Sequence, residues 1–378
     1  MFAPIIFLMV EDNSLAAVAV GTRLRERREW LKMTQAELSS RTGIGGSSLS
    51  DFENGKREPT LSQLKKLASS LEADVAGLLS ATQSPVATVR WRARPENAEV
   101  IEARFLKLCR QYRDLERWTA EEPPIQMRRA EQFPAGPRDV ELLARRVRHE
   151  MELGNRPGLV LQAKLEDDYG LKVFHIAVEP SGTAACTASA DCGTAVLLNS
   201  LNSRARRTFD LAHEFFHVLT WGLSVQSSTE DVEESLADRF AATLLIPEET
   251  LREAVERRIR DSQISLANMC ELARDFNVSV DALLWRMHNV YRWPDPDKTR
   301  ELIVRAGGLL SAYRDLTPDG DEVAEELPKR YKSLALQALR SGTISTGRFA
   351  EYMGLRRWQA MKYAQGAPGD EAISLPAV

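Results

Sequence analysis

Apolar residues recur at helical spacing along most of this chain, and strand-like segments are few and short. Between residues 20 and 80 the spacing predicts five short helices separated by turn residues. A long helix over about 96–119 follows, with an apolar stripe on one side and an Arg- and Glu-rich side that we expect to face solvent. Before this helix, a strand or loop is predicted over about 86–95, between Ser84-Pro85 and Arg94-Pro95. The pattern indicates a mainly α protein with one small β-sheet, of the α+β class.

One predicted helix carries the strongest chemical motif of the chain, with histidines at 213 and 217 around Glu214. Residues i and i+4 share one helix face, so the imidazoles of His213 and His217 can reach the same metal ion. Glu214 lies one residue further round and is free to act as a general base. A zinc site needs a third ligand and an open fourth position, and Glu234 is the best candidate ligand.

The alternative to a metal site is that both histidines are hydrogen-bonded residues of the core. Histidine is scarce here, with 5 in 378 residues, so this spacing rarely arises by chance.

Two neighbouring helices would hold this site. We expect the first to be capped by Thr208 or Asp210 and the second to span about 228–247. Their connection is short, so they should be antiparallel and bring Glu234 to the histidines. Asp238, one turn after Glu234, could accept the N–H of a ligand histidine and fix its orientation.

The segments RRTFDLAHEFFHVL and EESLADRFAATLLIP resemble the two metal motifs of the ImmA/IrrE family of metallopeptidases. The similarity extends over roughly residues 138–292 and implies strands around 171–179 and 194–199. It implies a gluzincin-like site for Zn²⁺, with Mn²⁺ as an alternative. Carried over by position, the ligands are His213, His217 and Glu234, the general base is Glu214, and Asp238 supports the ligands.

The chain departs from this family at two positions. Phe216 stands where the family usually has glycine, and Asp238 where it usually has asparagine. The resemblance also implies a Cro-type repressor as substrate, a partner or the chain itself, cut in a stress, phage or mobile-element response. The sequence does not rank the candidate donors to the oxyanion: His175, Arg206, His288 and Tyr291.

Residues 20–80 resemble the XRE/Cro-type helix-turn-helix domain. The matching positions are Gln35, Glu53, Asn54, Gly55 and Pro59. The resemblance implies a double-stranded DNA operator as partner, a recognition helix in the major groove, and a homodimer.

Gly45 and Gly46 stand where that family often has a polar cap and a base-reading glutamine. Ser47, Ser48 and Asp51 are then the side chains that face the groove. A helical interaction module without DNA binding remains the alternative. We expect phosphate contacts from four side chains: Gln35, Arg41, Lys56 and Arg57.

The net charge of −4 and pI near 5.9 argue against a protein that coats nucleic acid, but not against DNA binding by one domain. Four cysteines without a dense pattern fit free thiols in the cytoplasm. The apolar opening over 1–10 is too short to span a bilayer, so we expect no membrane partner.

The C-terminal region is predicted to be helical. Ser345 as a cap and Gly354 at a turn have the spacing of a small helix-turn-helix, which could bind DNA or pack on the peptidase. The predicted regions are a disordered or wrongly started N-terminus (1–19), the helix-turn-helix domain (20–80), a connector with the long helix and a Pro-rich linker (81–137), the metallopeptidase (138–292), the helical C-terminal region (293–366) and a disordered tail (367–378).

Two functions follow from these predictions. The first is a DNA-binding regulator with an active zinc endopeptidase domain. The second is a transcription factor whose peptidase-like domain senses a ligand or metal and cuts nothing. Glu214 favours the first, because a pure binding domain has no need of a base, whereas Phe216 favours the second.

Overall fold

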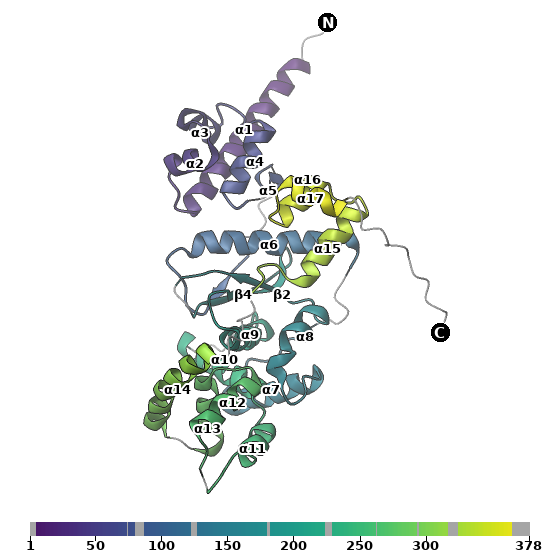
Figure 1. Ribbon diagram of the computed structural model, residues 1–378. Coiled ribbons are helices and arrows are strands. Elements are labelled where there is room, and N and C mark those ends of the chain that lie inside the picture. The colour runs from purple at the N-terminus through teal and green to yellow at the C-terminus, as the bar shows by residue number, and fades with distance from the viewer. Residues whose placement is uncertain are drawn as a thin grey trace, which may run out of the picture. The chain divides into compact units, whose positions relative to one another are not determined.

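The computed structural model describes residues 5–73, 75–79, 87–121, 127–179, 182–223, 229–261, 263–292, 295–316 and 324–364 (Figure 1). The chain divides into two compact units. Unit 1 comprises Met1–Ala87 and Pro95–Arg110, and unit 2 comprises Thr88–Arg94 and Gln111–Val378. The expected start of the second site helix near residue 228 and the predicted C-terminal tail lie outside the described residues.

Unit 1 contains the five helices that the sequence predicts. They are α1 (Ile5–Trp30), α2 (Gln35–Thr42), α3 (Gly46–Glu53), α4 (Leu61–Ser70) and α5 (Val75–Leu79). Thr34 and Thr60 each form a capping box, with Glu37 and Gln63 respectively, which satisfies the first amides of α2 and α4. α1 begins at Ile5, where the sequence analysis expected disorder through residue 19. The segment from Ile5 to Val20 has no Gly or Pro to interrupt a helix.

The crossing of α1 and α3 depends on Gly21. A Cβ at this position would clash with the carbonyl oxygen of Phe52, so only glycine permits so close an approach. The buried core of unit 1 gathers around this crossing, and its most deeply buried members include Leu24, Leu38, Leu49, Phe52 and Leu71.

Unit 2 is built around a four-stranded sheet with the order β1-β3-β4-β2. The strands are β1 (Arg90–Trp91), β2 (Lys172–Ile176), β3 (Ala184–Ser189) and β4 (Gly193–Asn199). β3 pairs antiparallel with both β1 and β4, and β2 pairs parallel with β4. The sequence did not predict β3, because its residues AACTAS include only one β-branched side chain and no aromatic one.

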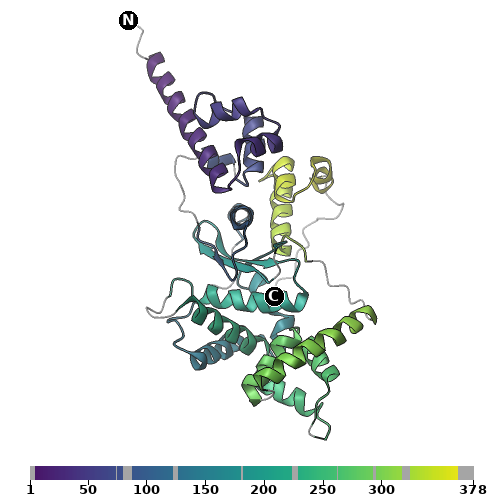
Figure 2. The ribbon, with the colours of Figure 1, turned by 90° about the vertical axis from the view of Figure 1, so that its left-hand side faces the viewer.

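Helices cover both faces of this sheet. α9 (Arg204–Leu219) packs on one face against β3 and β4, as Figure 1 and Figure 2 show. On the other face, Tyr112 in the C-terminal half of α6 (Ala98–Thr119) contacts Phe174 of β2, with ring centroids 6.3 Å apart. The remaining helices are α7 (Pro137–Glu150), the 3₁₀ turn η1 (Pro157–Leu159), α8 (Leu161–Asp167), α10 (Glu230–Leu245), α11 (Glu248–Glu256), α12 (Leu266–Phe276), α13 (Val280–Tyr291), α14 (Pro296–Leu316), α15 (Lys329–Arg340), α16 (Thr346–Tyr352) and α17 (Arg357–Ala364).

The polar side of α6 is not simply solvated, contrary to the sequence-based expectation. Glu116 has only 2% of its side chain exposed. It forms ion pairs with Lys172 at 3.1 Å and Arg330 at 2.8 Å. A carboxylate can be buried when it is paired in this way, and a charge run in the sequence does not reveal the partners.

The described helices include none long and apolar enough to cross a membrane. All four cysteines are free and buried.

Burial makes the stability of unit 2 depend on pH through Glu166 of α8. Burial raises the pKa of this carboxyl to about 7, against the hydrogen bond that Gln162 donates to it at 3.1 Å. The folded pKa of Glu166 lies above the unfolded one, so the folded state is favoured while this carboxyl is protonated. This contribution to stability is complete below about pH 4.5 and is lost as pH rises through about 7. We expect the free energy of unfolding to fall by up to about 3 kcal/mol over that window, measured by urea unfolding.

Glu166→Gln should flatten this dependence, whereas Asp167→Asn on the exposed side of the same helix should leave most of it. An equal pH slope in wild type and Glu166→Gln would contradict the assignment.

Candidate metal centre

The cap of the helix that carries both histidines lies five to seven residues before the two caps that the sequence suggested, Thr208 and Asp210. Ser203 is the N-cap of α9, and its hydroxyl accepts a hydrogen bond from the Arg206 amide at 3.3 Å. Thr208 and Asp210 therefore lie inside the helix and do not cap it. Asp210 is fully buried and accepts hydrogen bonds from Asn202 and Arg92, at 3.0 Å each.

The histidines of α9 meet a carboxylate of α10, as the short connection predicts. His213 Nε2 lies 2.9 Å from Glu234 Oε2, and His217 Nε2 lies 3.1 Å from Glu234 Oε1. The two Nε2 atoms are 3.3 Å apart. The sequence thus identified three residues whose ligand atoms converge on one point.

This cluster fits a divalent cation. Two imidazoles and a carboxylate form a donor set typical of a catalytic zinc site with one open position. Ligand atoms about 2.0–2.1 Å from a tetrahedral ion are roughly 3.3 Å apart, close to the separations of 2.9–3.3 Å between His213, His217 and Glu234. His213 and His217 are buried and Glu234 is partly exposed, which leaves access from one side.

The hydrogen bonds of the cluster favour a proton on His213. Burial alone would lower the pKa of His213, but hydrogen bonds to Asp238 and Glu234 raise it to about 9. Burial opposes ionisation of Glu234, yet the hydrogen bonds with His213 and His217 hold its pKa well below its usual range. The cluster therefore attracts positive charge, and a bound cation would displace this proton.

Glu214 lies beside the cluster with the environment of a general base. Its side chain is buried, and its Oε1 atom has no hydrogen-bond partner. Burial raises the pKa of this carboxyl, while the neighbouring His213 and His217 oppose the rise. The Cys186 thiol of β3 lies next to it, and burial together with the Glu214 carboxyl raises the thiol pKa. The thiol is thus neutral beside the carboxyl.

Asp238 lies where the sequence analysis expected support for a ligand. Its Oδ1 atom is 2.9 Å from His213 Nδ1, on the ring edge opposite the cluster. The same oxygen accepts a hydrogen bond from Arg92 Nη2 at 2.8 Å. Aspartate replaces the family's usual asparagine here, and Arg92 balances the additional charge.

Phe216, the other departure, packs in the core and not in the cavity. It is fully buried, and its ring centroid lies 5.9 Å from that of Phe133 and 5.6 Å from that of Phe240. Phe133 belongs to the segment predicted as a Pro-rich linker, so part of that linker contributes to the core of unit 2. The large side chain is thus matched by aromatic neighbours.

A cavity of about 230 Å³ opens onto the cluster. Glu214, His217 and Glu234 form part of its wall. The opposite wall comes from the connector before α6, and the sequence analysis did not anticipate this contribution. Its lining residues there are Val89, Arg90, Trp91 and Arg94. The one available signal was the dense alternation of Arg with apolar residues over 89–94.

None of the four oxyanion donors considered from the sequence lines this cavity. His175 and Arg206 have other partners, the backbone of Glu325 and the Asp210 carboxylate respectively. His288 stacks edge-on with Trp285, and Tyr291 lies under Arg252. Arg90 and Arg94 are the cationic side chains that the cavity offers.

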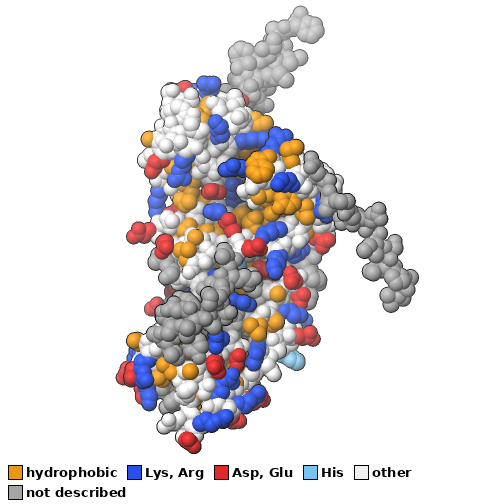
Figure 3. Space-filling view, in the orientation of Figure 1, with side chains coloured by type: hydrophobic (Ala, Val, Ile, Leu, Met, Phe, Trp, Pro, Cys, Tyr) orange, Lys and Arg blue, Asp and Glu red, His pale blue; other side chains and the backbone are white. Residues whose placement is uncertain are grey.

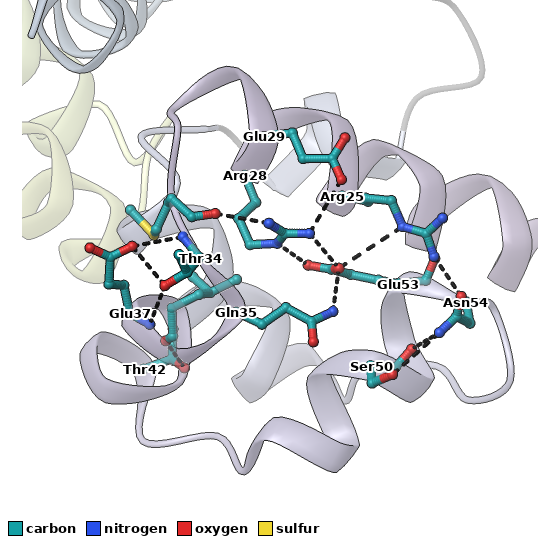
Figure 4. A network of polar contacts seen from close by, with 12 residues as sticks. Arg25, Arg28, Glu29, Thr34, Gln35, Glu37, Thr42, Ser50, Glu53 and Asn54 are labelled. Atoms are coloured by element: carbon teal, nitrogen blue, oxygen red, sulfur yellow. Dashed lines mark hydrogen bonds and ion pairs between the residues drawn. The ribbon is translucent and has the colours of Figure 1, made fainter.

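Unit 1 has the geometry of a helix-turn-helix. α2 and α3 are joined by a short turn in which Gly43 adopts a left-handed φ of 68°. Figure 4 shows the buried Glu53 at the centre of a polar network. It accepts hydrogen bonds from Arg28 at 2.7 Å and 2.9 Å and from Gln35 at 2.7 Å. The Gln35 amide nitrogen, expected at a phosphate, thus has an internal partner.

The other residues predicted to contact DNA lie at the surface of α2, α3 and the following turn. Arg41, Ser47, Lys56 and Arg57 are exposed, and Ser48 and Asp51 are half-buried. In Figure 3, basic and acidic side chains are mixed over the face shown, so charge does not mark a broad DNA-binding surface on that face.

Comparison with protein families matches two parts of the chain. Residues 24–78 match the helix-turn-helix family, and residues 166–288 match the IrrE N-terminal-like domain, a peptidase family. The chain joins a DNA-binding helix-turn-helix domain to an IrrE-like peptidase-family domain. No curated protein matches the chain.

The IrrE-like match runs from α8 to α13 and contains the whole cluster of His213, His217 and Glu234. The connector strand β1 lies outside both matches. The cavity wall that β1 contributes therefore comes from residues outside the matched segment.

Proposed function

We propose that the chain is a transcriptional regulator whose IrrE-like domain is a zinc-dependent endopeptidase. The observation that carries this proposal is the convergence of His213, His217 and Glu234 beside the buried, unpartnered carboxylate oxygen of Glu214. A purely structural cluster would satisfy that oxygen with a hydrogen bond. The same site would accept Mn²⁺ as well as Zn²⁺.

His213, His217 and Glu234 would hold the metal, which when bound acts as a Lewis acid and makes a nucleophile available at neutral pH. The protein's own groups handle the proton and the geometry. Glu214 accepts a proton from the attacking water at its Oε1 atom and returns it to the leaving amine. Asp238 fixes the ring of His213 through Nδ1.

The substrate that best fits this combination is a Cro-type repressor, either a partner or the chain itself. A helix-turn-helix domain on the same chain would bring the peptidase to the operator where such a repressor binds. Binding as a homodimer would match two half-sites. Gln35, Arg41, Ser47, Ser48, Asp51, Lys56 and Arg57 remain the residues proposed to contact DNA.

Metal removal tests the peptidase. The full chain, stripped by a chelator and then restored with Zn²⁺ or Mn²⁺, is incubated with Cro-type repressors encoded beside it, and fragments are identified by mass spectrometry. We expect cutting of a repressor or of the chain only after metal is restored. A chain that binds one equivalent of metal yet cuts neither would overturn the endopeptidase and favour the non-cleaving sensor.

A further inference from the structure

The connector strand β1 pairs with the edge of β3 that faces away from β4. Arg90 lies opposite Cys186 and Trp91 opposite Ala185, in antiparallel register. The pairing continues beyond the strand, because the Arg92 amide donates to the Ala184 carbonyl at 3.0 Å. At the other end, the Thr187 hydroxyl donates to the Thr88 carbonyl at 2.7 Å. Residues 88–92 thus pair with the edge of β3 in the way that an extended peptide would.

Two arginines anchor this segment to acids around the metal cluster. Arg90 pairs with Glu233, the residue before Glu234, at 2.7 Å. Arg92 pairs with Asp238 at 2.8 Å and with Asp210 at 3.0 Å. Asp238 contacts His213, and Asp210 lies one helical turn before it. The connector therefore contacts residues that hold the histidine in place.

The same segment closes one side of the cavity over the cluster. Val89, Arg90, Trp91 and Arg94 face a wall that contains Glu214, His217 and Glu234. A peptide substrate must place a carbonyl group within reach of these side chains. An exposed sheet edge is a general binding site for extended peptides, since its amides and carbonyls are unpaired. Here β1 already satisfies them.

We propose that the connector Thr88–Arg94 is an internal competitor of the substrate, bound on β3 in place of an extended substrate peptide. This proposal rests on the proposed endopeptidase function. The site opens to a substrate when the connector leaves β3, and it closes again when the connector returns. β1 has only two residues, so its release breaks few backbone hydrogen bonds. The segment follows the helix-turn-helix match in the sequence.

Competition by a free copy of the connector tests this proposal. The probe is a fluorescein-labelled peptide with the sequence of residues 86–95, added to the metal-free full chain so that nothing is cut. The tethered copy acts at an effective concentration of roughly millimolar, so the wild type should bind the probe weakly. Arg90→Ala with Arg92→Ala in the chain weakens the tethered copy, and we expect the probe to bind at least about tenfold more tightly.

The matched control is Arg145→Ala with Arg148→Ala. These arginines pair with Glu248 and Glu249 in the same unit, at 3.5 Å and 3.6 Å, and do not line the cavity. Probe binding should stay at the wild-type level. Equal binding by the wild type and both double variants would overturn the proposal.

A disulfide between β1 and β3 should hold the connector in place and so reduce probe binding, the opposite of the effect of the arginine substitutions. Because Arg92 and Ala184 are hydrogen-bonded, Trp91 and Ala185 form the closely spaced non-hydrogen-bonded pair, whose Cα separation of about 4.5 Å suits a disulfide. Oxidised Trp91→Cys with Ala185→Cys should lose probe binding and recover it on reduction. Trp91→Cys alone should not respond to oxidant. Undiminished binding to the oxidised double variant would overturn the proposal.

These outcomes are separable from those of the cleavage experiment. Probe binding as expected, without cleavage of any repressor, would retain the competitor and remove the endopeptidase. Equally fast repressor cleavage by oxidised and reduced forms of the locked variant would remove the competitor alone.

Discussion

Replacing Glu214 by glutamine should reduce the rate of repressor cleavage by roughly 10²–10⁴-fold, the usual contribution of a general base. Glutamine keeps the size of the side chain but cannot accept the proton. Glu214 lies beside the cluster, and its Oε1 atom has no hydrogen-bond partner, so it is the carboxyl placed to take the proton. The rate is measured on metal-loaded protein with the repressor identified by the cleavage experiment.

Metal content separates this effect from loss of the site. Glu214→Gln should still bind one equivalent of zinc, because His213, His217 and Glu234 are unchanged. Glu230→Gln is the matched control, since Glu230 lines the same cavity from an exposed position. Its rate should stay within a fewfold of wild type. A metal-loaded Glu214→Gln protein that cuts as fast as wild type would contradict the role of Glu214.

Replacing Glu53 by alanine should strongly destabilise unit 1 and weaken the gel shift on an operator. Only 2% of the Glu53 side chain is exposed, and it accepts two hydrogen bonds from Arg28. Removing one partner of a buried ion pair costs about 3–5 kcal/mol, because the remaining charge has no compensation. That is a large part of the roughly 5–15 kcal/mol by which a domain is stable. Urea unfolding of the full chain measures the change.

A second glutamate that pairs with Arg28 provides the control substitution. Glu29 also pairs with Arg28, at 3.5 Å, but 60% of its side chain is exposed. Exposed pairs contribute about 0–1 kcal/mol, so Glu29→Ala should leave both the unfolding transition and the salt-dependent DNA shift nearly unchanged. An equal loss of unfolding free energy in Glu53→Ala and Glu29→Ala would contradict the prediction that burial makes the Glu53 ion pair the more stabilising one.

The sequence predicted the helices well where local signals agree. The capping boxes of Thr34 and Thr60 and the turn at Gly43 are contacts between residues a few positions apart, so their side-chain types specify them directly. The start of α9 was placed wrongly because Ser203, Thr208 and Asp210 all resemble caps in isolation. Burial of Asp210 against Arg92, far away in sequence, distinguishes them.

The interior of the sheet was less predictable. β3 consists of small residues, and it is a strand because β1 and β4 pair with it on both sides. Glu116 and Phe133 were expected in solvent or in a linker, but ion pairs and aromatic contacts bury them. In each case the partner lies far away along the chain, where periodicity carries no information.

The sequence by itself determined the chemistry at the centre of the protein. The spacing of His213, Glu214 and His217 on one helix, followed by Glu234 on the next, fixes which side chains can share an ion, since helical geometry converts spacing into position. Only the tertiary structure decided what surrounds that centre. The connector around Arg90 and Arg92 reaches the cluster because the edge of β3 leaves backbone groups to be paired, and pairing between strands depends on the fold and not on neighbouring residues.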